Sequence, residues 1–284
     1  MSKLPKISIV SPSYNQEKFI KETIESVLEQ DYSNFEYVII DGGSSDNSQK
    51  IIKKYQNKLK YFESKKDRGQ SHAINKGFKH TDGEIMAWIN SDDVLKPGAL
   101  RLIASIFAQF PEIEWLTSLP STINEDAYQL YLAQPPLYVS QFIKMGFYTR
   151  KLFGFIMQEG TFWRRSLWEK AGSQLDEVPY SMDMKLWQKF AKYSRLYCVN
   201  ACLASYRLNP NRKNNDQHQN YYKEMNNLIP ALILLPVKVI WRQIAKIAHH
   251  SQLSPSIYFD QKKLSWYFRK NLLQIKSFQL LSDS

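Results

Sequence analysis

Short apolar runs alternate with amphipathic segments through the first 115 residues. Runs of strand length occur at residues 6–11, 35–40 and 85–89, with a shorter one near Tyr61. Between them, apolar side chains recur at the spacing of a helix that packs one face on a sheet, as in Phe19, Ile20, Ile24, Val27 and Leu28. Strands that alternate with helices predict right-handed crossovers and a mostly parallel sheet, so we expect an α/β fold.

Two adjacent acids, Asp92 and Asp93, follow the apolar run 85–89. Open parallel sheets bind ligands in the crevice outside the carboxyl ends of their strands. Mg²⁺ usually takes one or two carboxylates together with substrate phosphates and water, so a cation that holds a diphosphate fits this position. The pattern also suits an acidic turn that caps the next helix.

Asp41 follows the second predicted strand and can accept hydrogen bonds from a base or a ribose. Read alone, the sequence Asp-Gly-Gly at 41–43 is equally typical of a plain turn. The first turn has neither the G-x-G-x-x-G of dinucleotide folds nor the G-K-[ST] of a P-loop. Any nucleotide must therefore be held by carboxylates and backbone at the strand ends.

Six segments together resemble glycosyltransferase family 2. Four resemble its nucleotide-sugar half: residues 10–15 (VSPSYN), 40–46 (IDGGSSD), 67–77 (DRGQSHAINKG) and 90–93 (NSDD). Two resemble its acceptor half: residues 158–165 (QEGTFWRR) and 180–187 (YSMDMKLW). The resemblance spans roughly the first three quarters of the chain and implies the GT-A fold, a Rossmann-like sheet flanked by helices.

The resemblance also implies roles for particular side chains. Asp41 contacts uracil or ribose, Asp92 contacts ribose, and Asp93 binds Mn²⁺ or Mg²⁺ on the diphosphate. Asp183 occupies the position of the catalytic base. The remaining predicted nucleotide-sugar contacts are Pro12, Tyr14, Asp67, Arg68 and Gln70; the predicted acceptor contacts are Gln158, Glu159 and Trp163; and the predicted diphosphate contact is Arg207.

Two further roles also have structural alternatives. Asp183 precedes the helical pattern of Leu186, Trp187 and Phe190, where a carboxylate is favoured in its ionised form but can equally be a helix cap. Trp163 can stack on a sugar ring, although most such aromatic side chains belong to a core.

The charge is distributed unevenly. The chain of 284 residues has a net charge of +11, and residues 237–281 hold eight basic side chains and one acid. Apolar positions at residues 237–248 and 264–275 fall at helical spacing beside Lys and Arg, which predicts two helices lying in the plane of an anionic membrane surface. Packing on the catalytic domain or on a second subunit is the alternative.

These observations predict a catalytic domain at residues 1–215, divided near residue 115 into nucleotide-sugar and acceptor halves, followed by a helical, basic amphipathic tail at 216–284. The N-terminus lacks the pattern of a signal peptide. Cys198 and Cys202 have no nearby set of zinc ligands, so we expect thiols in a reducing compartment.

We therefore predict an inverting glycosyltransferase of the hexosyltransferase type. It moves a sugar from a nucleotide sugar, a UDP-sugar by preference, to a hydroxyl of a glycan or lipid-linked acceptor in polysaccharide or glycolipid synthesis. We expect a cytoplasmic protein, peripheral on the inner face of the plasma membrane, with no nucleic-acid partner. A sugar nucleotidyltransferase and a non-catalytic carbohydrate- or lipid-binding protein are the alternatives.

Overall fold

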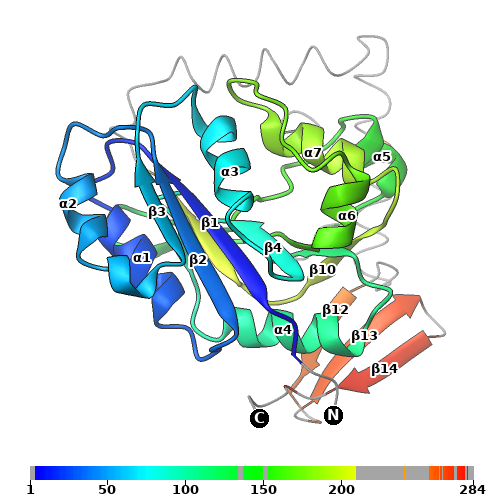
Figure 1. The fold of residues 1–284 in the computed structure, drawn as a ribbon. Helices are drawn as coiled ribbons and strands as arrows, with labels where there is room; N and C mark the ends of the chain where they lie inside the picture. Colours follow the sequence, from blue (N-terminus) through cyan, green and yellow to red (C-terminus); the bar gives the residue numbers. More distant parts are fainter. Residues whose placement is uncertain are drawn as a thin grey trace.

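The structure is a computed structural model. It describes residues 4–133, 137–149, 153–208, 240, 256–261, 263, 265–271, 274–278 and 280. Within these residues a large twisted sheet passes through the middle of the molecule, with helices on both of its faces (Figure 1).

The predicted α/β fold is confirmed by this sheet. In the described part of the chain it has ten strands, in the order β14-β13-β12-β10-β6-β9-β4-β1-β2-β3. From β6 to β3 every strand except β9 runs in the same direction. The bounds are β1 (Ile7–Ser13), β2 (Phe35–Asp41), β3 (Tyr61–Ser64), β4 (Ile85–Trp88), β6 (Trp115–Thr117), β9 (Phe162–Arg164), β10 (Leu196–Val199), β12 (Ser256–Asp260), β13 (Ser265–Asn271) and β14 (Gln274–Phe278).

Helices cover both faces of the sheet because successive strand residues point to opposite faces and are apolar on each. Ile7 and Ile9 of β1 pack in one buried cluster, with side chains of α1 (Ile20–Leu28), α2 (Ser48–Lys53) and α4 (Ala99–Gln109). Val10, next along the same strand, packs in the other cluster. That cluster contains side chains of α3 (Gln70–Phe78), α5 (Ser140–Lys144), α6 (Arg165–Lys170) and α7 (Met182–Phe190). A 3₁₀ turn, η1 (Gln56–Lys58), precedes β3.

A second, smaller sheet lies beside the carboxyl end of β4. Its order is β5-β11-β7-β8, from β5 (Val94–Leu95), β11 (Ala204–Arg207), β7 (Ser121–Ile123) and β8 (Gln129–Leu132). Because β5 begins directly after Asp93 and pairs antiparallel with β11, the end of β11 is brought alongside the two acids.

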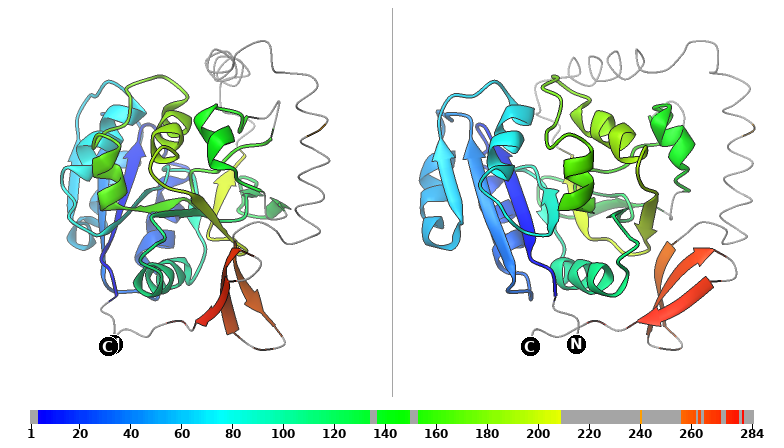
Figure 2. Two further views of the ribbon diagram at one scale, coloured as in Figure 1. Left: turned by 90° about the vertical axis from the view of Figure 1, so that its right-hand side faces the viewer. Right: turned by 45° about the vertical axis from the view of Figure 1, so that its right-hand side comes forward.

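The C-terminal tail corrects one prediction. Among the described residues of the range 264–275 the expected helix is absent: β13 and β14 occupy them and, together with β12, extend the central sheet (Figure 2). Ile257 and Phe268 are buried in the core, and the Phe268 ring lies 4.6 Å from that of Phe110 and 5.5 Å from that of Tyr197. Leu264, Trp266 and Phe268 also alternate with period two, and pairing of β13 with β12 and β14 decides between the periods. Of the helix predicted at 237–248, only Ile240 is among the described residues.

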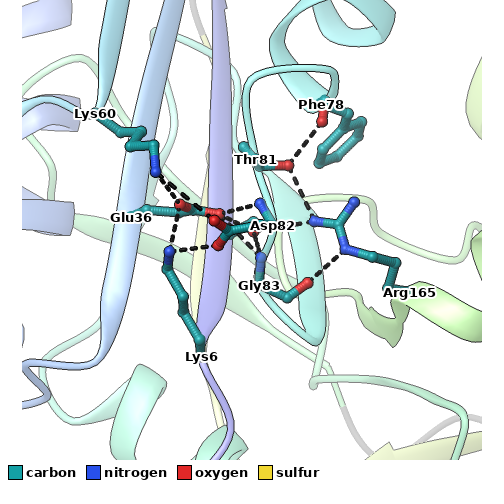
Figure 3. A network of polar contacts seen from close by, with 9 residues as sticks. Lys6, Glu36, Lys60, Phe78, Thr81, Asp82, Gly83 and Arg165 are labelled. Atoms are coloured by element: carbon teal, nitrogen blue, oxygen red, sulfur yellow. Dashed lines mark hydrogen bonds and ion pairs between the residues drawn. The ribbon is translucent and has the colours of Figure 1, made fainter.

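The amino ends of the parallel strands are held by a charged network centred on Glu36 (Figure 3). This side chain is buried and accepts hydrogen bonds from Ser8 Oγ at 2.7 Å and from the backbone N–H groups of Asp82 and Gly83 at 2.6 and 3.0 Å. Lys6 pairs with it at 2.7 Å. The network therefore joins β1, β2 and the turn before β4.

Candidate active site

The two acids lie in a buried turn at the carboxyl end of β4. Asp92 and Asp93 have exposed fractions of 2% and 0%. One carboxylate oxygen of Asp93 accepts the backbone N–H of Arg207 at 2.9 Å, and the other accepts the side-chain amide of Asn90 at 3.0 Å. Two donors from different elements thus fix the direction of this carboxylate.

Asn90 is a site residue to which sequence reasoning assigned no role. Its amide donates to Asp93 and, at 3.1 Å, to the side-chain oxygen of Gln158, while its own oxygen accepts from Gln70 at 2.6 Å. Gln158 in turn donates to the carbonyl of Trp88. Asn90 therefore connects residues 70 and 158, from the two halves of the domain, to the acid. Its position within the NSDD segment is the signal that could have identified it.

Asp41 ends β2 beside Ser13 of β1 and Ser64 of β3. It is fully buried and accepts hydrogen bonds from Ser64 Oγ at 2.6 Å and from the backbone N–H and side chain of Ser44 at 2.9 and 2.5 Å. A Cβ added at Gly42 would come 3.1 Å from a carboxylate oxygen of Asp67, so these two acids line neighbouring turns.

The other predicted nucleotide-sugar contacts lie at the same edge of the sheet. Pro12 is buried within β1, whereas Tyr14, two residues later, is 62% exposed. Arg68 forms a bidentate pair with Glu177 at 2.8 and 2.9 Å, which joins the loop before α3 to the loop before α7. The contacts of these residues with a nucleotide sugar stay predictions.

Asp183 is the second residue of α7 and lies in its first turn. The cap of this helix is Ser181, so Asp183 is not the cap. It is half-buried, and one oxygen accepts the backbone N–H of Met184 at 2.7 Å. The preceding residue, Met182, receives a hydrogen bond on its sulfur from Ser71 Oγ at 3.0 Å. Since Ser71 follows Gln70, which binds Asn90, the start of α7 is held against the nucleotide-sugar half.

Trp163 corrects a second prediction. It lies on β9, between β4 and β6, and its side chain is fully buried. Its ring is 5.5 Å from that of Trp88 and 5.8 Å from that of Trp187. It is therefore part of the core and cannot stack on an acceptor sugar. Gln158 and Glu159, also predicted acceptor contacts, are both buried, with exposed fractions of 6%, and Gln158 binds Asn90 of the acid turn.

Arg207 corrects a third. Its side chain is fully buried, donates to the carbonyl of Asp92 at 2.8 Å and pairs with Glu22 at 2.6 Å. The guanidinium thus bonds protein groups behind the acid turn. This arrangement does not support a contact with a donor diphosphate.

Comparison with known proteins identifies the family. The profile of glycosyl transferase family 2 matches residues 8–170, more than half of the chain. The chain belongs to this family.

Relatives of this glycosyl transferase family 2 chain are named glycosyltransferases. An uncharacterized glycosyltransferase of Rickettsia typhi is 28% identical over 195 residues, which cover 68% of this chain and 61% of that protein. The UDP-Glc:alpha-D-GlcNAc-diphosphoundecaprenol beta-1,3-glucosyltransferase WfgD of Escherichia coli is 36% identical over 101 residues, 35% of this chain and 40% of WfgD. The chain thus spans less than two thirds of these relatives.

Solved structures confirm the GT-A fold. TarS of S. aureus, in complex with UDP-GlcNAc, has a TM-score of 0.61 at 18% identity, over 78% of this chain and 65% of that one. The mannosyltransferase PcManGT of Pyrobaculum calidifontis, in complex with GDP-Man and Mn²⁺, has a TM-score of 0.59 at 17% identity, over 87% and 70% of the two chains.

The donor set at the acid turn fits a cation that arrives with a phosphorylated ligand. Among the described residues, no group of three or more His, Cys, Asp or Glu side chains could enclose a metal ion. Asp92 and Asp93 supply hard oxygen atoms, and Mg²⁺ typically needs only one or two carboxylates when phosphates and water complete its shell.

The described part of the chain contains no helix of the length and apolarity needed to cross a membrane.

Proposed function

We propose that this protein transfers a sugar from a UDP-sugar to a hydroxyl of a glycan or lipid-linked acceptor, with inversion at the anomeric carbon. The observation that supports this best is the link from Asp93 through Asn90 and Gln70 to Ser71 and the start of α7, which bears Asp183. A donor-side acid and a candidate base are thereby held by one set of contacts.

In the proposed reaction, the Asp183 carboxylate accepts the proton of the acceptor hydroxyl. The hydroxyl oxygen forms a bond to the anomeric carbon as the bond between that carbon and the diphosphate oxygen breaks. The electron pair of the broken bond leaves with UDP. A single displacement of this kind inverts the anomeric configuration and requires no covalent sugar–enzyme species.

Asp93, with Asp92 beside it, would hold Mn²⁺ or Mg²⁺, which when bound neutralises charge on the departing diphosphate. The buried turn gives Asp93 one defined direction, because Asn90 and residue 207 each bind one of its oxygens. Asp41, at the neighbouring strand end, is proposed to contact uracil or ribose.

The test compares three classes of protein. Thermal stabilisation by UDP, by nucleoside triphosphates and by free sugars is measured with and without Mn²⁺, and products are identified by NMR of the anomeric proton. We expect stabilisation by UDP that increases with Mn²⁺, and an inverted product with release of UDP. Release of pyrophosphate from a nucleoside triphosphate and a sugar phosphate would instead show a nucleotidyltransferase. Binding of sugar without turnover of any donor would show a binding protein.

We further propose that the acceptor is lipid-linked and that the basic tail holds the enzyme at the anionic inner face of the plasma membrane. The charge of residues 237–281 supports this, with eight basic side chains against one acid. Because β12–β14 extend the sheet, deletion of the tail would remove Phe268 from the core and expose its neighbours Phe110 and Tyr197. The test therefore uses the full chain with Lys238, Arg242 and Lys246 changed to Gln. Sedimentation with anionic vesicles should decrease; unchanged sedimentation would contradict the proposal.

A further inference from the structure

Arg207 holds the peptide group of Asp92 from behind the acid turn. Its Nε donates to the carbonyl of Asp92 at 2.8 Å, and one terminal nitrogen donates to the carbonyls of Asn124 and Glu125 at 2.9 and 2.7 Å. The other terminal nitrogen pairs with Glu22 at 2.6 Å. Three separate parts of the chain, α1, the acid turn and the β7–β8 turn, thus meet on one guanidinium.

The backbone of the same residue holds Asp93. In the antiparallel pair of β5 and β11, Ser205 lies opposite Val94, so continuing the register places Arg207 opposite Asp92. From there its N–H reaches a carboxylate oxygen of Asp93 at 2.9 Å. Residue 207 therefore fixes one acid by its side chain and the other by its main chain.

The guanidinium cannot shift without losing several contacts at once. Its carbon lies 5.0 Å from the centre of the Phe19 ring, and its side chain has no exposed surface. A planar fork with this many acceptors has one orientation, which the single ammonium of lysine does not reproduce.

We propose that Arg207 is a positioning residue that sets the geometry of the Asp92–Asp93 turn for its cation, and that it does not touch the nucleotide sugar. This inference rests on the proposed function. In this inference the buried Arg207 side chain holds the carbonyl of Asp92, and its backbone N–H orients the carboxylate of Asp93.

Arg164 offers a matched control at the opposite end of the sheet. Its side chain is 13% exposed, donates to the carbonyls of Ile113 and Phe107 at 2.9 and 2.6 Å, pairs with Glu84, and lies 5.1 Å from the centre of the Phe107 ring. It pairs across the sheet with Ile85, the first residue of β4, and not with the turn after that strand. The two arginines are thus alike in environment and differ in which strand end they hold.

The experiment measures UDP binding to the full chain by calorimetry over a series of Mn²⁺ concentrations, for the parent, Arg207→Lys and Arg164→Lys. Loss of an outer-shell partner commonly lowers metal affinity about 10–100-fold. We expect Arg207→Lys to raise the Mn²⁺ concentration for half-maximal UDP binding at least ~10-fold, with UDP affinity restored at saturating Mn²⁺. The Mn²⁺ resonance in electron paramagnetic spectra of the UDP complex should also broaden. Arg164→Lys should change melting temperature without shifting the Mn²⁺ dependence.

Three outcomes would overturn the inference. An unshifted Mn²⁺ dependence in Arg207→Lys would remove the positioning role. Equal shifts in both variants would indicate general loosening of the fold. A loss of UDP affinity that persists at saturating Mn²⁺, while uridine binds normally, would show that Arg207 contacts the diphosphate itself.

If Arg207→Lys does not fold, Glu22→Gln takes its place, because the Glu22 side chain is 45% exposed and its loss leaves the buried arginine in position. It should shift the Mn²⁺ dependence in the same direction by a smaller factor, and no shift would again reject the role. A parent protein that binds no UDP in Mn²⁺ would reject the proposed function itself, which separates the two failures.

Discussion

The two ends of the central sheet each bury a carboxylate, and they hold it by different kinds of donor. At the amino ends, Glu36 pairs with the ammonium groups of Lys6 and Lys60 at 2.7 and 3.5 Å. At the carboxyl ends, Asp93 accepts hydrogen bonds from the side-chain amide of Asn90 and the backbone N–H of residue 207. One acid has cations of the protein beside it, and the other is oriented by neutral amides.

This difference separates stability from function in physical terms. Lys6 and Lys60 balance the charge of Glu36 within the fold, so that end of the sheet is complete without a ligand (Figure 3). The amide donors fix the direction in which the Asp93 carboxylate points, as a site for a cation requires. We therefore expect substitutions at the carboxyl end to affect activity more than stability, and substitutions at the amino end to do the reverse.

Asp93→Asn should have the largest effect. The amide keeps the shape of the side chain but removes the charge that holds the cation, so turnover should fall at least ~10³-fold. Initial rates with a UDP-sugar and Mn²⁺ measure this, with melting temperature as the control for folding. Full activity of the variant, or full activity of the parent in excess chelator, would contradict the metal role.

Asp183→Asn should lower the rate at least ~10²-fold, the usual contribution of a positioned general base, while UDP affinity stays close to that of the parent. Rates at saturating donor and calorimetry with UDP separate the two effects. If the variant instead loses UDP affinity and stability together, Asp183 is structural and the base is another residue, with Glu159 the first to test because it follows Gln158, which binds Asn90 of the acid turn.

Local patterns predicted the elements that bury one regular face. The strands expected at residues 6–11 and 35–40 appear as β1 and β2, and the apolar run 85–89 as β4, because alternation and run length report burial directly. The segment 264–275 was predicted wrongly because its apolar positions satisfy both periods. Its pairing with β12, which in turn pairs with β10 about 60 residues earlier in the chain, selects the strand.

The candidate site was only partly predictable for a related reason. The acids stand out as a pair in the sequence, but the partner of Asp93 on β11 is 114 residues away, and a two-residue strand brings them together. Trp163 has an aromatic side chain of the type that stacks on sugar rings. Its place in the core follows from the insertion of β9 between β4 and β6. The surroundings of both residues are decided by contacts between segments far apart in the chain, and no short stretch of sequence contains both partners.

Glu36→Gln tests the amino end and should act on stability alone. Burial by itself would raise the pKa of Glu36, but hydrogen bonds from Lys6, Ser8 and the backbone lower it from 4.5 to about 2. A carboxyl group whose pKa is lower in the folded state than in the unfolded chain stabilises the protein fully when the pH is above the unfolded-state pKa. That contribution is lost as the pH falls from about 4.5 towards 2.

We expect Glu36→Gln to lower the free energy of unfolding at pH 7 by about 2–3 kcal/mol and to flatten its decline below pH 5. Urea unfolding at a series of pH values measures both quantities. Specific activity of the folded fraction should not change. A variant that retains the acid-side decline of the parent would show that other carboxylates cause it.

The smallest effect distinguishes the two lysines at this end. Lys6 lies 2.7 Å from Glu36 and is 33% exposed, whereas Lys60 lies 3.5 Å away and is 46% exposed. Exposed ion pairs contribute about 0–1 kcal/mol, because solvent screens the attraction and the long side chain loses entropy. Lys60→Met should therefore lower stability by less than ~0.5 kcal/mol, and Lys6→Met by about 1 kcal/mol. Urea unfolding of both variants in low and high salt measures the difference, which should shrink as salt is added. Equal losses in the two variants would mean that the charge of Glu36 is balanced by the surrounding field as a whole and not by its contact with Lys6.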